Sequence, residues 1–234
     1  MRYISKIFLF IGLASIVGCE TYTPIPFDRQ AAGVENISMP GDILPDTAVV
    51  GQAASVGSSF GLIGALVDAG IQSNRQGRVK ELFETHRYNP EASFTDKITS
   101  AVEERGFTLS VLNTERQKRD FLETYPASPA PVDAYLDIVA LNYGFASAGV
   151  GVTWRPYITT KVKLVSAQDQ SVLMDNQIIY NPIGATAKGI ITISADPQYG
   201  FRDVNAMEAD PERAMKGLDD AFEKVAETVA TLLQ

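Results

Sequence analysis

Side chains that commonly carry catalysis or hold metal ions are scarce in this chain of 234 residues. It has one cysteine, Cys19, and one histidine, His86. Zinc sites and imidazole-activated nucleophiles need several such side chains together, so the sequence argues against both kinds of site. His86 lies in the polar run ETHRYNP at the end of a predicted helix, where we expect a solvated or capping residue. No metal and no cofactor is predicted.

Carboxylates are the remaining groups that could do chemistry, because two acids can act as acid and base across a glycosidic bond. Neighbouring acids on a helix point about 100° apart, so the pairs Glu103-Glu104 and Asp219-Asp220 are predicted to be solvated faces. Asp137, inside a predicted strand, is the better candidate. Its strand neighbours are a mixed set, so we favour a structural hydrogen bond over a catalytic role.

Cys19 ends a short apolar segment at the start of the chain. Residues 1–6 carry Arg2 and Lys6 and no acid, and 7–16 are apolar or small. This apolar run of about ten residues suits a secretory signal and is about half the length that spans a bilayer. Gly18 suits a peptidase that needs a narrow side chain beside the scissile bond. These features predict a signal peptide over residues 1–18, with Gly18 beside the cleavage site.

The run Ile16-Val17-Gly18-Cys19 resembles the lipobox of bacterial lipoproteins. The resemblance implies that Cys19 receives a diacylglycerol on sulfur, becomes the new N-terminus and is then N-acylated, for example with palmitate. The alternatives are an ordinary secretory peptide and an anchor helix that happens to contain a cysteine. Residue 20 is Glu20 rather than the aspartate that retains lipoproteins in the inner membrane, so the resemblance implies the periplasmic leaflet of the outer membrane.

The charge balance excludes several kinds of partner. Without Arg2 and Lys6, 18 basic residues remain against 28 acidic ones, a balance of −10. An acidic chain without a basic cluster argues against nucleic acid and against electrostatic attachment to anionic lipid. Membrane contact would therefore depend on the acyl chains. With Cys19 acylated, no cysteine is left for a disulfide.

Residue patterns predict a lipidated tether over 19–33 and one periplasmic α+β domain over 34–234. The expected fold is an antiparallel sheet of about four to six strands, with helices packed on it and a long C-terminal helix. Three well-patterned strands are predicted in the middle of the chain, over 134–145, 157–166 and 171–180. Shorter strands are predicted over 34–39, 47–50, 107–112 and 190–194.

Helical spacing of apolar residues predicts a helix over 91–105 and the long terminal helix from Asp210 onward. In the latter, Asp210 is the N-cap and Pro211 the first helical residue. A short charged helix is also predicted over 115–125.

A glycine-rich stretch, 49–71, precedes a polar helical segment, and a glycine-rich helix is predicted over 56–72. Gly57, Gly61 and Gly64 do not form a nucleotide loop, because the Lys-Ser/Thr of a Walker motif is missing. Three alternatives remain for this stretch. Close packing on the sheet is favoured over self-association through the three glycines and over membrane insertion.

The loop 146–154 is small and apolar and ends at the only tryptophan of the chain. It is either an ordinary hairpin loop or, if exposed, a partner-binding tip formed by Val150, Val152 and Trp154, since tryptophan is common among interface anchors.

Two further resemblances bear on the class of protein. Residues 27–78, with FDRQAAGVENISMPGDILPD and SSFGLIGALVDAGIQSNRQGR, resemble a group of proteobacterial lipoproteins with no assigned activity. The order of elements is similar to the α/β domains of the curli-secretion lipoprotein, the penicillin-binding-protein activators and the TolB amino-terminal domain. These resemblances imply a fold and a cellular location, and they transfer no function.

The function expected from the sequence is a non-catalytic scaffold or assembly role of a lipid-anchored envelope protein that binds another protein. One alternative is an accessory subunit of an export or transport machine, oligomeric through the glycine-rich helix. The other is a carboxylate-dependent hydrolase acting on envelope glycan. The sequence does not predict the oligomeric state.

Overall fold

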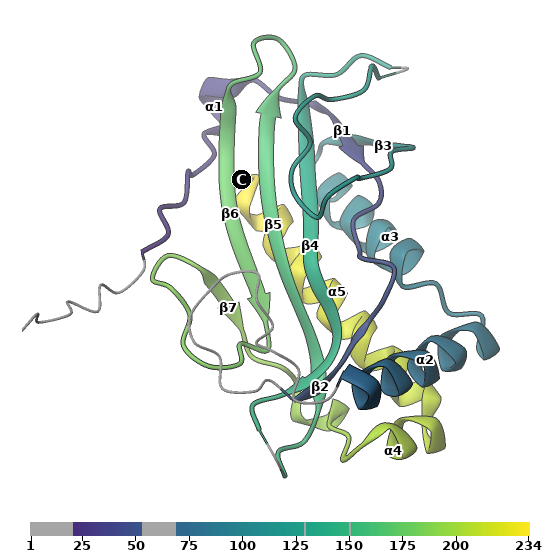
Figure 1. The fold of residues 1–234 in the computed structure, drawn as a ribbon. Coiled ribbons are helices and arrows are strands. Elements are labelled where there is room, and N and C mark those ends of the chain that lie inside the picture. Colours follow the sequence, from purple (N-terminus) through teal and green to yellow (C-terminus); the bar gives the residue numbers. More distant parts are fainter. Residues whose placement is uncertain (1–20, 53–68, 129, 150) are drawn as a thin grey trace, which may run out of the picture.

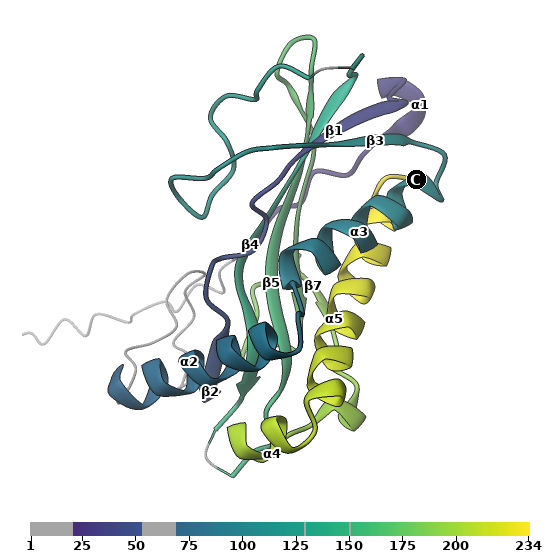
Figure 2. The same cartoon turned by 90° about the vertical axis from the view of Figure 1, so that its right-hand side faces the viewer.

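An open β-sheet carries helices on one face in the computed structural model (Figures 1 and 2). The structure describes residues 21–52, 69–128, 130–149 and 151–234. Helices α3 (Pro90–Glu103) and α5 (Pro211–Leu232) lie against that face, and α2 (Ala69–Thr85) and α4 (Val204–Ala209) lie together near one end of the sheet. The predicted α+β class is confirmed.

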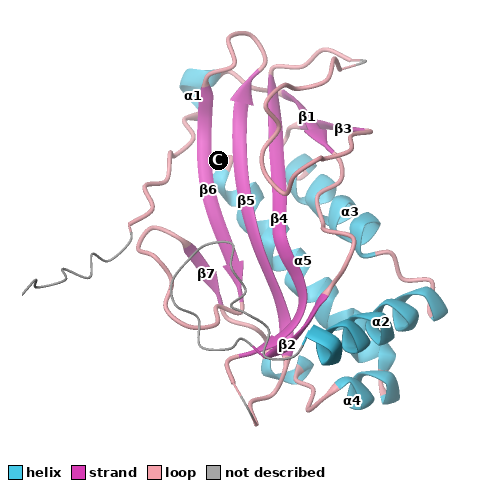
Figure 3. Ribbon diagram, viewed as in Figure 1, coloured by secondary structure: helices cyan, strands magenta, loops and turns pink. Residues whose placement is uncertain are grey.

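The centre of the sheet is formed by three long antiparallel strands (Figure 3). They are β4 (Ala134–Ser147), β5 (Arg155–Ser166) and β6 (Val172–Tyr180). Ile158, Val162 and Leu164 alternate along β5 and have no exposed area. Alternation of this kind is the signature of a strand with one core-facing side, and all three central strands occur where the sequence predicts them.

Shorter strands flank this centre, and each pairs with its neighbour in parallel. They are β1 (Asn36–Pro40), β2 (Val49–Gln52), β3 (Thr108–Leu112) and β7 (Ile191–Ile193). The order is β3-β1-β4-β5-β6-β7, with β2 on the far half of β4. The described sheet thus has seven strands where four to six were predicted. Only the central pairs β4–β5 and β5–β6 are antiparallel. Helices α2 and α3 lie in the connection between β1 and its parallel partner β3, as parallel pairing requires a crossover.

Helix α5 is built as the sequence predicts. The Asp210 side chain accepts a hydrogen bond from the Arg213 backbone N–H at 3.3 Å, which caps the first turn. An apolar stripe faces the core, and Phe222 stacks on Phe94 of α3 with ring centroids 4.9 Å apart. Gly217 permits the close approach of α5 to the sheet, because a Cβ there would lie 2.9 Å from Pro156.

The charged helix predicted over 115–125 does not form. This segment lacks regular secondary structure, and the side chains of Arg116, Arg119 and Asp120 bond to distant parts of the chain instead. The Arg116 N–H and the Arg119 guanidinium both donate to the Asp42 carboxylate. Because these long-range bonds override local helix propensity, the prediction was wrong.

The described part of the predicted tether, 21–33, is attached to the sheet. The Tyr22 N–H donates to the Lys188 carbonyl at 2.9 Å, and Ile25 exchanges two backbone hydrogen bonds with Asp175 of β6. Residues Arg29–Ala32 then form the short helix α1, which is visible at the top of Figure 1. From Tyr22 onward this segment is therefore part of the fold.

Several predictions fall outside the described residues. Gly18, Cys19 and the glycines Gly57, Gly61 and Gly64 are among them. Of the predicted glycine-rich helix, only the portion from Ala69 onward is described, as the start of α2. Within the described ranges, no helix has the length and apolar character needed to cross a membrane.

Candidate functional site

Asp137, the strongest acidic candidate in the sequence, is held in a buried hydrogen-bond network. Its side chain and that of Arg116 are both 0% exposed, and Arg116 Nη2 lies 2.7 Å from Asp137 Oδ1. Oδ2 accepts hydrogen bonds from the Leu122 N–H at 2.8 Å and from the Tyr125 hydroxyl at 3.2 Å. The structural role predicted for Asp137 is confirmed, and the network fastens the segment after β3 to β4.

The adjacent acids of α5 bond to different elements, as their angular separation requires. Asp219 accepts hydrogen bonds from the hydroxyls of Tyr88 at 2.9 Å and Ser93 at 2.5 Å. Asp220 accepts one from the Tyr180 hydroxyl at 2.7 Å. Burial first, and the Asp219 carboxylate second, raise the pKa of Tyr88 above its ordinary value. The prediction of a merely solvated pair was therefore wrong, because both acids are half-buried hydrogen-bond acceptors.

The other candidate catalytic residues remain at the surface. His86 is exposed at the end of α2, and Glu103 and Glu104 are exposed at the end of α3, as predicted. Within the described ranges, no group of three or more His, Cys, Asp or Glu side chains is placed to hold a metal ion.

Trp154 does not lie at an exposed loop tip. Its side chain is only 3% exposed, and its backbone exchanges two hydrogen bonds with Phe201, at 2.7 and 2.8 Å. Val152 is 49% exposed, and Val150 lies outside the described residues. The loop therefore does not present the indole to solvent, because Trp154 pairs with the segment preceding α4.

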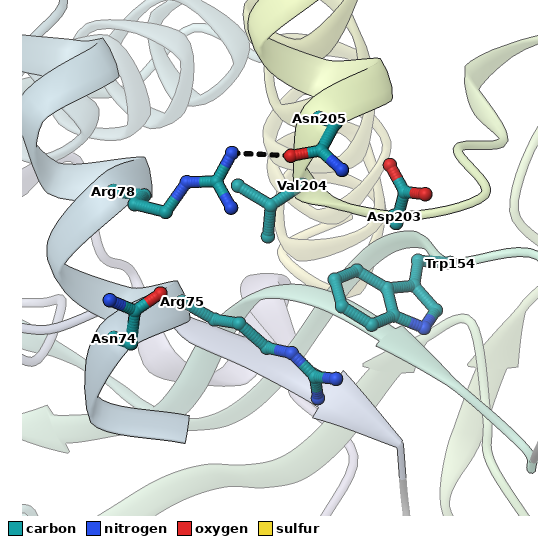
Figure 4. A pocket seen from close by; sticks show the side chains of 7 residues that line it. All are labelled: Asn74, Arg75, Arg78, Trp154, Asp203, Val204 and Asn205. Atoms are coloured by element: carbon teal, nitrogen blue, oxygen red, sulfur yellow. Dashed lines mark hydrogen bonds between the residues drawn. The ribbon is translucent and has the colours of Figure 1, made fainter. Parts of the chain in front are cut away.

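Trp154 instead lines a pocket of about 400 Å³ between α2, α4 and the start of β5 (Figure 4). The Arg75 guanidinium lies over the indole, 5.0 Å from the ring centroid. At this separation the cation is attracted by the negative face of the ring. The residues lining the pocket are Asn74, Arg75, Arg78, Trp154, Asp203, Val204 and Asn205.

Arg78 fixes one wall of this pocket by joining α2 to α4. Its guanidinium donates to both oxygens of Glu208, at 2.7 and 2.5 Å, and to the Asn205 side-chain oxygen at 2.6 Å. The bidentate arrangement matches the geometry of guanidinium and carboxylate. Hydrogen bonding to Arg78 lowers the pKa of Glu208 below its ordinary value, so the charge of Arg78 is balanced within the protein.

Asp203 has a structural role at the pocket edge. Its side chain caps α4 by accepting from the Ala206 N–H at 2.9 Å, and it also accepts from the Arg202 guanidinium at 3.1 Å. The Ala206 N–H is the main reason that the pKa of Asp203 is lowered. The pocket lining thus offers a cation and amides for binding, and it contains no hydroxyl, thiol or imidazole nucleophile among the described residues.

Of the residues that line this pocket, the sequence singled out only Trp154, and as part of a loop tip rather than of a pocket. Arg75 and Arg78 are three residues apart, so they lie on one face of α2, and this spacing was the available signal. Asn205 and Asp203 carried none, because α4 is short and reaches α2 only through tertiary folding.

No protein-family model and no curated protein matches the chain. Solved structures with a partly similar course of the chain do exist. Protein XCC0632 from Xanthomonas campestris, of family DUF330, is 12% identical with a TM-score of 0.42, over 84% of this chain and 81% of that one. The PelC dodecamer from Paraburkholderia phytofirmans is 10% identical with a TM-score of 0.39, over 91% and 95%. A point variant of that dodecamer is 9% identical with a TM-score of 0.37, over 91% and 96%. The function therefore has to be inferred from the residues of this chain.

Proposed function

We propose that this chain is a lipid-anchored envelope protein that acts without catalysis, as a scaffold or assembly factor that binds another protein. The observation that carries this proposal is the composition of the pocket at Trp154. Arg75 and the pocket amides are binding groups, whereas the most deeply buried acid of the described fold, Asp137, is committed to Arg116. A hydrolase would instead need two free acids facing a cleft.

The proposed cellular location depends on the segment Ile16-Val17-Gly18-Cys19 and on Glu20. Lipidation at Cys19 would anchor the protein to a membrane, and Glu20 in place of aspartate favours the periplasmic leaflet of the outer membrane. Acyl chains of this kind hold a protein without any membrane-spanning helix.

The attachment of the N-terminal segment would make the lipid anchor short. Tyr22 is bonded to Lys188, and it follows closely after Cys19 in the chain. An extended chain of about three residues reaches at most about 11 Å. The proposed anchor therefore holds the domain close to the membrane, with the edge near β6 and Lys188 nearest to it.

The helices that line the pocket lie apart from the segment next to the proposed anchor. In Figure 1 residues 21–28 run along the β6 side of the sheet, whereas α2 and α4 lie at the lower right, and Figure 2 agrees. A partner protein would then bind at α2 and α4 while the anchor holds the edge near β6.

Membrane fractionation and in-cell crosslinking test the proposal together. Replacing the acceptor, Cys19→Ser, should abolish processing and move the protein out of the membrane fraction, while Ser15→Ala in the same apolar segment should leave both unchanged. Crosslinking in intact cells should recover a reproducible protein partner with the lipidated chain. Unchanged fractionation of the Cys19→Ser variant would refute the anchor, and the absence of any reproducible partner would refute the scaffold role.

A further inference from the structure

The pocket between α2 and α4 leaves one cation without a carboxylate partner. Arg75 lies over Trp154, and no acid among the described residues forms an ion pair with it. Its neighbour Arg78 is neutralised by Glu208, as described above. A guanidinium that is held in place and forms no ion pair with the described residues is a ready site for an anion, because it can make paired charge-assisted hydrogen bonds.

Two side-chain amides, those of Asn74 and Asn205, line the same pocket, as does the Asp203 carboxylate that caps α4. Asn74 is exposed and makes no side-chain hydrogen bond with the described residues. The oxygen of Asn205 accepts from Arg78, which leaves its two N–H donors for a ligand. Figure 4 shows both amides at the same pocket as Arg75. Together these groups match a carboxylate accompanied by amide groups of its own.

We propose that this pocket binds a carboxylate from an acidic segment of a protein partner, with Arg75 as the anchoring cation. The inference rests on the proposed function, which is protein binding, and it names the chemistry of the partner. The Arg75 guanidinium packs on the ring of Trp154. Trp154 is only 3% exposed, so it has no open aromatic face on which a sugar ring could stack. For this reason an acidic peptide fits the pocket better than an acidic glycan.

Because the whole chain is acidic, an acidic partner must be recognised by short-range contacts in the pocket. The protein carries a formal net charge of −8, so long-range attraction does not bring an acidic partner to it. Binding must then depend on the contact with Arg75, and salt should weaken it because the charges are partly solvated.

The only tryptophan of the chain supplies a direct probe, since Trp154 forms the pocket wall. The full chain in detergent is titrated with the acetylated and amidated hexapeptide Gly-Ala-Glu-Glu-Ala-Gly, and with its counterpart in which both Glu are Gln. We expect a saturable change in tryptophan emission with the Glu peptide only. Calorimetry measures the same binding independently of fluorescence, which covers a contact that leaves the emission unchanged.

Matched variants assign the binding to Arg75. Arg75→Gln should weaken the affinity for the Glu peptide by about tenfold or more, as expected for the loss of a charge-assisted pair. Lys80→Gln removes the same charge from the same helix, where Lys80 pairs only with Glu84 among the described residues and its side chain is 69% exposed. Its affinity should equal that of the unmodified protein.

Three results would overturn the inference. They are equal binding of the Glu and Gln peptides, equal loss in the two variants, and Arg75-dependent binding of oligogalacturonate without binding of the Glu peptide. If the peptide fails while Cys19-dependent fractionation and a crosslinked partner persist, the inference falls and the proposed function stands. If the peptide binds through Arg75 but fractionation does not depend on Cys19 and no partner is recovered, the proposed function falls and the site stands.

Discussion

Removal of the Asp137 carboxylate should destabilise the fold severely, because it breaks a buried ion pair with Arg116. Its side chain and that of Arg116 are both 0% exposed and 2.7 Å apart. Asp137→Ala leaves a buried guanidinium uncompensated and removes the acceptor of the Leu122 N–H. Breaking a buried pair from one side costs about 3–5 kcal/mol, which is a large part of the roughly 5–15 kcal/mol that holds a typical domain folded.

Urea denaturation of the full chain in detergent, followed by circular dichroism, measures this loss as a lower midpoint at an unchanged slope. Asp120→Asn is the matched control, because Asp120 pairs with Lys161 in the same segment but is 61% exposed. The control should lose no more than about 1 kcal/mol. If Asp137→Ala prevents folding, Asp137→Asn provides the measurement, since its amide oxygen can still accept from Leu122.

A double variant separates the ion pair from simple loss of packing. Adding Arg116→Met to Asp137→Ala removes the uncompensated cation, so the double variant should be more stable than Asp137→Ala alone. The buried-pair interpretation is refuted if Asp137→Ala costs as little as the Asp120→Asn control, or if the double variant loses the sum of the two single losses.

Three other substitutions have outcomes set by close contacts or charge. Gly217→Ala should lower the free energy of unfolding by about 1–3 kcal/mol, because its Cβ would lie 2.9 Å from Pro156. A melting temperature equal to that of the unmodified protein would contradict the close approach. Gly144→Ala should prevent stable folding, because φ there is +135° and its Cβ would clash with the Val49 backbone; normal expression with a native melting temperature would contradict this. Arg78 lowers the pKa of Glu208 below 4.5, so this pair stabilises the fold above that pH. The contribution is lost as pH falls through the lowered pKa. Glu208→Gln should therefore flatten the acid side of a plot of the urea midpoint against pH, and an unchanged plot would count against the pair.

The parts of the fold that sequence predicted well are those specified by local pattern. Helix α5 is indicated by Asp210, Pro211 and an apolar stripe that ends near Leu232. Strands β4, β5 and β6 have long alternating runs bounded by turn residues. In both cases the period of apolar residues matches the element, so local and tertiary preferences agree.

Long-range contacts account for what the sequence did not reveal. Residues 115–125 look helical locally, but Arg116 bonds to Asp42 and Asp137, far apart in sequence. Close backbone approaches at Gly144 and Gly217, which the sequence did not single out, also depend on contacts with distant residues. The pocket depends on α2 meeting α4 across 130 positions, as the Arg78–Glu208 hydrogen bond shows, and no local pattern encodes that meeting.

Site-specific photo-crosslinking in intact cells tests most directly whether the anchored protein binds a partner through this pocket. A benzoylphenylalanine at position 74 places the crosslinker at the pocket rim, and one at position 80 places it on an exposed part of the same helix. We predict a defined protein adduct at position 74 that is lost with Arg75→Gln and is absent at position 80. An adduct of equal yield at both positions, or one at position 74 that persists without Arg75, would contradict binding through the pocket.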